Sequence, residues 1–280
     1  MPSLLSKLRD VPLVFIDVET TGASTRWGDR VTEIAAARFK GGQLVTPFSQ
    51  LVDPQRRIAP GVVALTGITQ EMVTGQPTLS TLLDRLIELS RDSVIIGHNV
   101  LFDLSFIADE FRRAGRSFGD FLAGTHVVDT VRLARRTRGR RGNGLQRLAA
   151  LFGVEVATAH RALADCLTTQ AVMTHLLAPL GGLDMMLADV LATQGGAIRV
   201  AADPTPAQQL LPIDLEEALA QRVPVKIIYL DARNNRSERV VHPLRLREAS
   251  GSVTLVAHCT LRNESRTFKV ERIIELQRIE

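Results

Sequence analysis

Five side chains in three short segments have the chemistry needed to hydrolyse a phosphodiester bond. Asp17 and Glu19 lie in VFIDVETTG, Asp103 lies in GHNVLFDLSFI, and His160 and Asp165 lie in HRALADC. Carboxylates that lie close together repel one another at neutral pH, and divalent cations relieve that repulsion. A histidine, whose ordinary pKa is about 6.5, can accept a proton near neutrality. These residue types predict a site in which metal ions and a general base activate a water molecule.

Local patterns indicate how these side chains are positioned. Alternation of apolar and polar residues around Asp17 and Glu19 predicts a strand, which places both carboxylates on one face about 7 Å apart. Asp103 falls in the first turn of a predicted helix, where the helix dipole favours a negative charge. Taken singly, Asp103 is equally well explained as a helix-capping acid, and His160 as a surface or packed residue.

The elements that must hold these side chains follow an order typical of a mixed α/β domain. A period of two predicts strands, and an apolar stripe at spacings of three and four predicts helices. In chain order we predict strands 11–19, 31–39 and 43–52, a helix over 78–90 capped by Thr78, a strand over 93–96, a helix over 101–114, a strand over 127–129, and helices over 145–152 and 161–177. This order predicts a mixed sheet with helices packed against it.

The chain changes character after the last of these helices. Glycines and prolines punctuate 181–212, which predicts a linker, with one short helix over 183–193, between a first domain at 1–180 and a second at 213–280. A helix over 214–221 and strands over 225–230, 239–247, 253–259 and 266–270 predict a small, mostly β second domain. We expect its core to contain Ile227, Leu244, Leu255 and Phe268.

Charge and composition favour a nucleic-acid partner without proving one. The 280 residues are 45% hydrophobic and 23% charged, and only four of the 34 basic residues are lysines. The planar guanidinium group suits phosphate, although codon bias explains the same arginine excess. Five arginines crowd a segment expected to be a loop, where they either track phosphates or form a solvated face: Arg135, Arg136, Arg138, Arg140 and Arg141.

Cysteine usage and hydropathy bear on the compartment. The two cysteines, Cys166 and Cys259, make neither a disulfide framework nor a zinc site. No apolar run approaches the ~20 residues of a membrane span, and the N-terminal residues lack the pattern of a secretory leader. We therefore expect a cytoplasmic protein without a membrane partner.

Together with DRVTEIAA, LVDP and VVDTVRLARR, the three acidic segments resemble the DEDDh 3′→5′ exonucleases, whose type member is the proofreading epsilon subunit of bacterial DNA polymerase III. The resemblance covers residues 11–177 and implies an RNase H-like fold with a five-stranded mixed sheet. It also implies two Mg²⁺ or Mn²⁺ ions held by Asp17, Glu19, Asp103 and Asp165, with His160 as the general base. The expected substrate is a nucleic acid with a 3′ end, single-stranded DNA being favoured, and the expected products are nucleoside 5′-monophosphates.

Six residues beside the implied metal ligands are candidate contacts for the terminal nucleotide or its phosphate. Phe102 has a ring that can stack on a base, but a core position explains it at least equally well. Glycine in the turn after Glu19 lets a substrate approach the backbone closely. The six residues are Thr20, Thr21, Gly22, His98, Asn99 and Phe102.

The second domain is similar to the WYL domain, a module with a small Sm/SH3-like barrel. The similarity rests on segments such as His242-Pro243 and RTFKVERI, whereas Val253-Thr254-Leu255 stands where the eponymous Trp-Tyr-Leu would be. The resemblance implies an accessory domain that senses a ligand or nucleic acid through a basic face. The candidate residues are Tyr229, His258, Arg262, Arg266 and Arg272; solvation of a small barrel explains these arginines equally well.

Two other functions remain open from the sequence. The chain is alternatively a non-catalytic nucleic-acid-binding regulator that uses the nuclease fold as a platform, or an exoribonuclease that trims RNA. Recognition of the 2′-hydroxyl separates DNA from RNA, and no motif here identifies that contact. A polymerase, helicase or repair partner is equally undefined.

Overall fold

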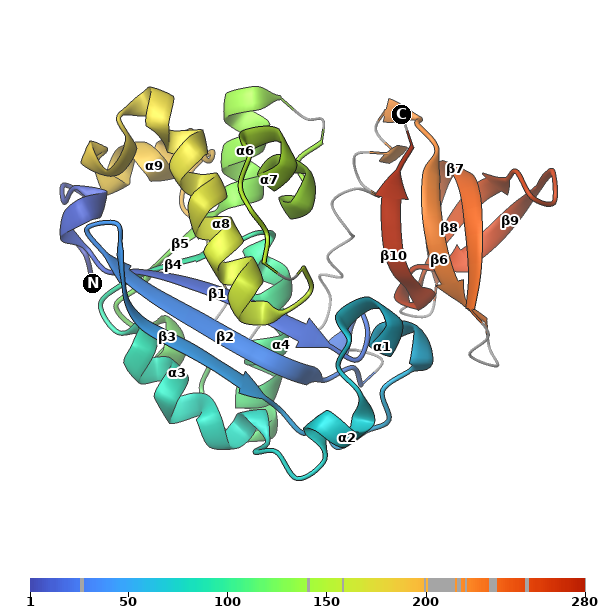
Figure 1. The fold of residues 1–280 in the computed structure, drawn as a ribbon, viewed down its shortest axis with the longest axis horizontal. Helices are drawn as coiled ribbons and strands as arrows, with labels where there is room; N and C mark the ends of the chain where they lie inside the picture. The colour runs from blue at the N-terminus through green and yellow to red at the C-terminus, as the bar shows by residue number, and fades with distance from the viewer. Residues whose placement is uncertain are drawn as a thin grey trace.

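A computed structural model describes residues 1–25, 28–139, 142–157, 159–198, 200, 215, 218–219, 221–231, 236–249 and 252–279. Within these residues the strands form two five-stranded sheets, one in each half of the chain (Figure 1). No helix in the described part of the chain is long and apolar enough to cross a membrane.

The first sheet is mixed, as predicted. Its strands are β1 (Leu13–Thr20), β2 (Val31–Lys40), β3 (Gln43–Leu51), β4 (Val94–Gly97) and β5 (His126–Asp129), in the order β3-β2-β1-β4-β5. The first three strands form an antiparallel meander, and β4 and β5 run parallel to β1. The carboxyl ends of β1, β4 and β5 therefore meet at one edge of the sheet, where ligands bind in open α/β sheets.

Helices cover both faces of this sheet (Figure 1). They are α1 (Pro60–Thr66), α2 (Gln70–Val73), α3 (Leu83–Ser90), α4 (Val100–Arg113), α5 (Gly119–Leu122), α6 (Thr130–Arg138), α7 (Leu145–Phe152), α8 (Ala162–Leu177) and α9 (Leu187–Thr193), with short 3-10 helices at Leu8–Asp10, Leu79–Leu82, Ala178–Leu180 and Gly182–Asp184. One apolar core lies between the sheet and α6 to α9, and a second lies between the opposite face and α3 to α5.

Two local predictions for the first domain need correction. The helix expected over 78–90 begins as a 3-10 turn and becomes α-helical only at Leu83, because the Thr78 hydroxyl bonds to Ser80 and does not cap the helix. The arginine-rich segment, expected to be a loop, is helical as far as Arg138. Asp129 caps this helix, α6, by accepting the N–H of Val131. Arg140 and Arg141 lie outside the described residues.

Much of the expected linker packs on the first sheet. Leu187 and Val190 of α9 are fully buried in the core beside α8. The Gln194 side chain binds the edge strand β5, accepting the Asp129 N–H at 2.9 Å and donating to the Val127 carbonyl at 3.1 Å. Residues 201–214 lie outside the described part of the chain, so the boundary at 213 stays a prediction.

The second sheet is an antiparallel one that forms a separate unit, as expected for a WYL domain. Its strands are β6 (Val225–Leu230), β7 (Arg236–Ala249), β8 (Ser252–Cys259), β9 (Glu264–Lys269) and β10 (Ile273–Arg278), in the order β10-β6-β7-β8-β9, with a 3-10 turn at Val270–Arg272. The strand β10 was missed from the sequence. Ile227, Leu255 and Phe268 are buried as predicted, but Leu244 is 56% exposed. The ladder shifts register between Pro243 and Arg245, and this irregularity turns Leu244 out of the core.

Candidate active site

The carboxyl end of β1 carries two of the expected acids on the face that α8 covers. Asp17 and Glu19 share this face with Phe15, which belongs to the core beneath α8. Across the ladder, Glu19 lies directly opposite Glu33 of β2. The register shifts between Glu19 and Thr20, so Glu19 is the last residue of the regular pairing. The predicted strand geometry of Asp17 and Glu19 is therefore present at the edge where parallel strands end.

The first turn of α8 and the residues before it bring the histidine and a third acid to this edge. Asp165 accepts the His160 N–H on Oδ2 at 3.1 Å and the Gln146 side-chain amide on Oδ1 at 3.0 Å. One ligand atom from each of Glu19, His160 and Asp165 lies within 4.8 Å of the other two. The backbone of His160 has φ 59°, in the left-handed region that non-glycine residues seldom adopt.

The fourth acid arrives from the opposite face of the sheet. Asp103 lies in the first turn of α4, which directly follows β4, and its Oδ1 accepts the Val18 N–H at 3.0 Å. This bond joins the start of α4 to β1 between Asp17 and Glu19. The carboxyl group of Asp103 is buried, and its charge raises the pKa of Asp17.

Burial and mutual repulsion make this group of acids reluctant to ionise. Burial is the largest cause of a raised pKa at Asp17, with repulsion from Asp103 second. Burial and repulsion from Asp165 raise the pKa of Glu19 to about 8. The pKa values of Asp103 and Asp165 are raised too, chiefly by burial. A site of this kind is stable in its ionised form only when positive charge is supplied.

The donor set fits divalent cations. Carboxylate oxygens are the ligands that Mg²⁺ and Mn²⁺ prefer, and a cation at this edge removes the repulsion that raises the pKa of Glu19. The structure brings Glu19, His160 and Asp165 within reach of one ion. That Asp17, Glu19, Asp103 and Asp165 would hold two ions stays a prediction, as does the choice between Mg²⁺ and Mn²⁺.

Two side chains that contact this site were missed from the sequence. Gln146 of α7 orients Asp165, as described above. Glu33 of β2 is buried, and its carboxylate binds both the Arg161 guanidinium and the Ala162 N–H. The signal for Glu33 was present: an acid within the apolar strand segment VTEIAAA needs a buried partner.

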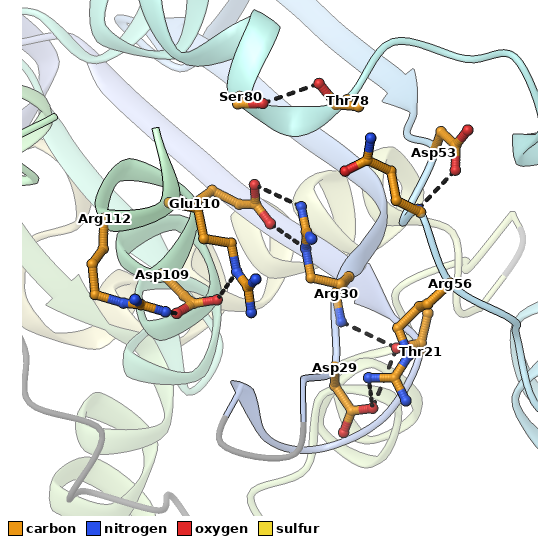
Figure 2. A network of polar contacts seen from close by, with 12 residues as sticks. Thr21, Asp29, Arg30, Asp53, Arg56, Thr78, Ser80, Asp109, Glu110 and Arg112 are labelled. Carbon is orange, nitrogen blue, oxygen red and sulfur yellow. Dashed lines mark hydrogen bonds and ion pairs between the residues drawn. The ribbon is translucent and has the colours of Figure 1, made fainter. Parts of the chain in front are cut away.

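The loop that follows Glu19 is held by a polar network (Figure 2). The Thr21 hydroxyl contacts Asp29 Oδ1 at 3.3 Å and accepts the Arg30 N–H at 3.1 Å. The Arg30 guanidinium in turn binds the buried Glu110 carboxylate of α4 at 2.5 and 3.0 Å. A Cβ at Gly22 would lie 2.4 Å from Asp29 Oδ2, so glycine is required there by packing as well as by any substrate approach.

Thr20 also stabilises this turn, because its hydroxyl donates to the Gly22 carbonyl at 2.6 Å. Asn99 begins α4 with φ 66°, and its N–H donates to Asp129 Oδ1 at 3.1 Å. Phe102 is half-buried and packs against Phe106, with ring centroids 5.0 Å apart. Contact of these side chains with a nucleotide stays a prediction.

His98 is held inside the fold. Its Nδ1 lies 2.8 Å from the Thr130 hydroxyl, which donates its own proton to the Gly97 carbonyl. The ring also has a hydrogen bond with the Asn143 backbone, which raises the pKa and opposes the effect of burial. Burial lowers the pKa of His98 to about 4, so the ring stays neutral at physiological pH.

In the second unit the candidate residues have different surroundings. Tyr229 packs edge-on against Phe268 at 5.2 Å, and its hydroxyl accepts the Lys269 N–H at 3.4 Å. His258 bonds to Asn263 at 3.2 Å. Arg262 and Arg266 are exposed on the surface, and Arg272 is half-buried.

Residues 14–173 match the protein family described as Exonuclease (RNase_T), and residues 213–278 match the WYL domain. The chain is 38% identical over 182 residues to a Mycobacterium tuberculosis protein named as a bifunctional exonuclease/endonuclease, covering 62% of this chain and 28% of that one. It is 33% identical over 171 residues to the PolC-type DNA polymerase III of Staphylococcus epidermidis, covering 61% of this chain and 12% of that one. The chain thus spans less than a third of the length of these relatives.

Solved structures share the fold. An apo exonuclease I superimposes with a TM-score of 0.54 at 20% identity, covering 94% of this chain and 63% of that one. Escherichia coli exonuclease I in complex with a dA16 oligonucleotide gives a TM-score of 0.52 at 22% identity, covering 89% of this chain and 55% of that one.

Proposed function

Because the chain belongs to the RNase_T exonuclease family, we propose that it is a DEDDh enzyme that removes nucleotides from the 3′ end of a nucleic acid, single-stranded DNA being favoured over RNA. The observation that carries this proposal is the convergence of Glu19, His160 and Asp165 within 4.8 Å. Asp103 supports it by binding β1 beside Asp17. Glu19 and Asp165 come from distant parts of the chain, and burying their charges together lowers the stability of the fold. Such a destabilising cluster is typical of a functional site.

The proposed reaction is hydrolysis of the last phosphodiester bond. His160 takes a proton from the attacking water, whose oxygen bonds to phosphorus while the bond from phosphorus to the 3′ oxygen breaks. The shortened strand keeps a 3′-hydroxyl, and the released product is a nucleoside 5′-monophosphate. Two divalent cations held by Asp17, Glu19, Asp103 and Asp165 would lower the pKa of the water and stabilise charge on the leaving oxygen.

We assign an accessory role to the second unit. Exposed arginines Arg262 and Arg266 give it positive charge for a nucleic-acid backbone or an anionic ligand. Replacing both with serine should weaken binding of long single strands while leaving turnover of very short oligonucleotides intact. The matched control is Arg85→Ser, which removes positive charge from an exposed position on α3. Equal affinity in all these proteins contradicts a tethering role.

The decisive experiment uses single-stranded DNA and RNA of one sequence, each labelled at the 5′ end, with Mg²⁺, Mn²⁺ or EDTA. Attack from the 3′ end yields a ladder of shortening labelled strands, whereas attack from the 5′ end releases the label at once as a mononucleotide. Chromatography identifies the product as a 5′- or 3′-monophosphate. Asp17→Asn should abolish the ladder, and His160→Ala should slow its appearance by about 10²–10⁴-fold. Glu88→Gln, an exposed change on α3, should do neither.

The outcomes separate the candidate functions. A metal-dependent ladder on DNA supports the proposal, and one confined to RNA favours the trimming exoribonuclease. Strand binding without degradation under any metal contradicts the proposal and favours the binding regulator.

A further inference from the structure

Glu33 stands in an unfavourable position that requires a cation. It lies directly opposite Glu19 on neighbouring strands, and like charges so placed repel each other. Glu33 is 2% exposed, so water does not screen this repulsion. Residues on the same face of β2, such as Ala35, are apolar and cannot compensate.

The cation is Arg161, the residue next to the proposed general base. Its Nε and Nη2 donate to the two carboxylate oxygens of Glu33, each at 2.9 Å. The same carboxylate accepts the Ala162 N–H at 3.1 Å and the Ser49 hydroxyl at 3.2 Å. A bidentate pair fixes orientation as well as distance, so β2 holds the backbone at the start of α8 in one arrangement.

The contacts of Arg161 and Ala162 with Glu33 also constrain the backbone of the preceding residue, His160. Its left-handed backbone, with φ 59°, persists only where neighbouring contacts enforce it. On one side its N–H is bound by Asp165 at 3.1 Å. On the other side Arg161 and Ala162 are both bound by Glu33. The segment from 160 to 162 is thus clamped at both ends.

We propose that Glu33, acting through Arg161, is a positioning residue that sets His160 against the acids of the site. This inference rests on the proposed exonuclease function. The alternative is that the Glu33–Arg161 pair contributes only to folding stability. The two differ in a measurable way, because a positioning residue has no catalytic effect once the group it positions is gone.

A double-mutant cycle separates them. Loss of a supporting hydrogen-bond partner typically lowers activity by about 10–100-fold, so Glu33→Gln should lower kcat in that range with little change in KM. In the His160→Ala background, the same change should lower the residual kcat less than about threefold. An equal loss in both backgrounds overturns the proposal.

The matched control is Glu110→Gln. Glu110 is also 2% exposed and also binds one arginine, Arg30, through both oxygens, but it contacts neither His160 nor Arg161. Its effect should be the same with and without His160. If Glu33→Gln and Glu110→Gln behave alike in the cycle, the Glu33 pair is only structural.

A second readout does not depend on activity. Amide hydrogen exchange of His160, followed by NMR, should quicken in Glu33→Gln although its own acceptor, Asp165, is unchanged. Glu110→Gln should leave that amide protected. Unchanged protection in Glu33→Gln overturns the proposal, even if the wild type degrades no nucleic acid and the proposed function itself fails.

Discussion

Glu19 should destabilise the metal-free protein at neutral pH. Its pKa is raised from 4.5 to about 8 by burial and by Asp165. The folded state therefore favours the protonated acid, and the penalty appears as pH rises through 4.5, grows until about pH 8 and is absent below pH 4.5. At about 1.36 kcal/mol per pKa unit, the 2.5 units between 4.5 and 7 correspond to on the order of 3 kcal/mol at pH 7.

The perturbation is Glu19→Gln, measured by urea unfolding in EDTA. Circular dichroism at 222 nm follows the unfolding of the helices. We expect the variant to be more stable than the wild type by about 3 kcal/mol at pH 7, or roughly 6–12 °C in Tm for a domain of this size. The difference should vanish below about pH 4.5, where Glu19 is mostly protonated in both the folded and the unfolded protein.

Metal should narrow this stability difference between the variant and the wild type. At a hundredfold excess over its Kd, a cation stabilises the wild type by about 2.7 kcal/mol, and Glu19→Gln should gain less because it lacks a ligand. Glu88→Gln, whose carboxylate is 68% exposed, should stay within about 0.5 kcal/mol of the wild type throughout. A stability difference for Glu19→Gln that does not change with pH, or a less stable variant in EDTA, would refute the electrostatic reasoning.

Three further predictions concern the surroundings of the site. His98 should remain neutral from pH 8 to 5 in ¹⁵N NMR, because burial lowers its pKa to about 4. It stabilises the fold above pH ~6.5 and loses that contribution as pH falls towards 4, and an imidazolium signal at pH 6 contradicts this. Gly22→Ala should cost about 1–3 kcal/mol in thermal unfolding, since its Cβ would lie 2.4 Å from Asp29; an unchanged Tm argues against the close contact. Gln146→Leu should weaken Mn²⁺ binding, measured by calorimetry, by about 10–100-fold because Asp165 loses its orienting bond, and wild-type affinity would show that this bond is not needed.

Local periodicity was enough to predict most of the elements that position the site. Alternation places Asp17 and Glu19 on one face of the strand, whatever the rest of the chain does. In the structure they lie near the carboxyl end of β1, the central strand of the sheet. The start of α8 directly after His160 and Arg161 is likewise a local property. Local pattern does not say that these segments lie together. The resemblance to a known family implied one shared site, and the order of the strands became known only from the structure.

Features that depend on contacts between distant segments were beyond the sequence. The Glu33–Arg161 pair joins residues 128 positions apart. The sequence around either residue does not indicate its partner. Leu244 fits the strand alternation, yet the shifted ladder with β8 turns it outward. The helix α6 was missed because its arginines indicate solvation, while Asp129, whose capping bond to Val131 starts it, was assigned to the preceding strand.

The placement of Asp103 and Asp165 shows why the fold alone does not stabilise this site. Both lie in the first turn of a helix, α4 and α8, where the dipole stabilises a negative charge by about 0.3–1 kcal/mol. Their pKa values are nevertheless raised, so burial outweighs the dipoles. The helices thus offset part of the repulsion and leave a remainder. A divalent cation would relieve that remaining repulsion. A substitution that relieves the repulsion in the metal-free protein should therefore weaken metal binding.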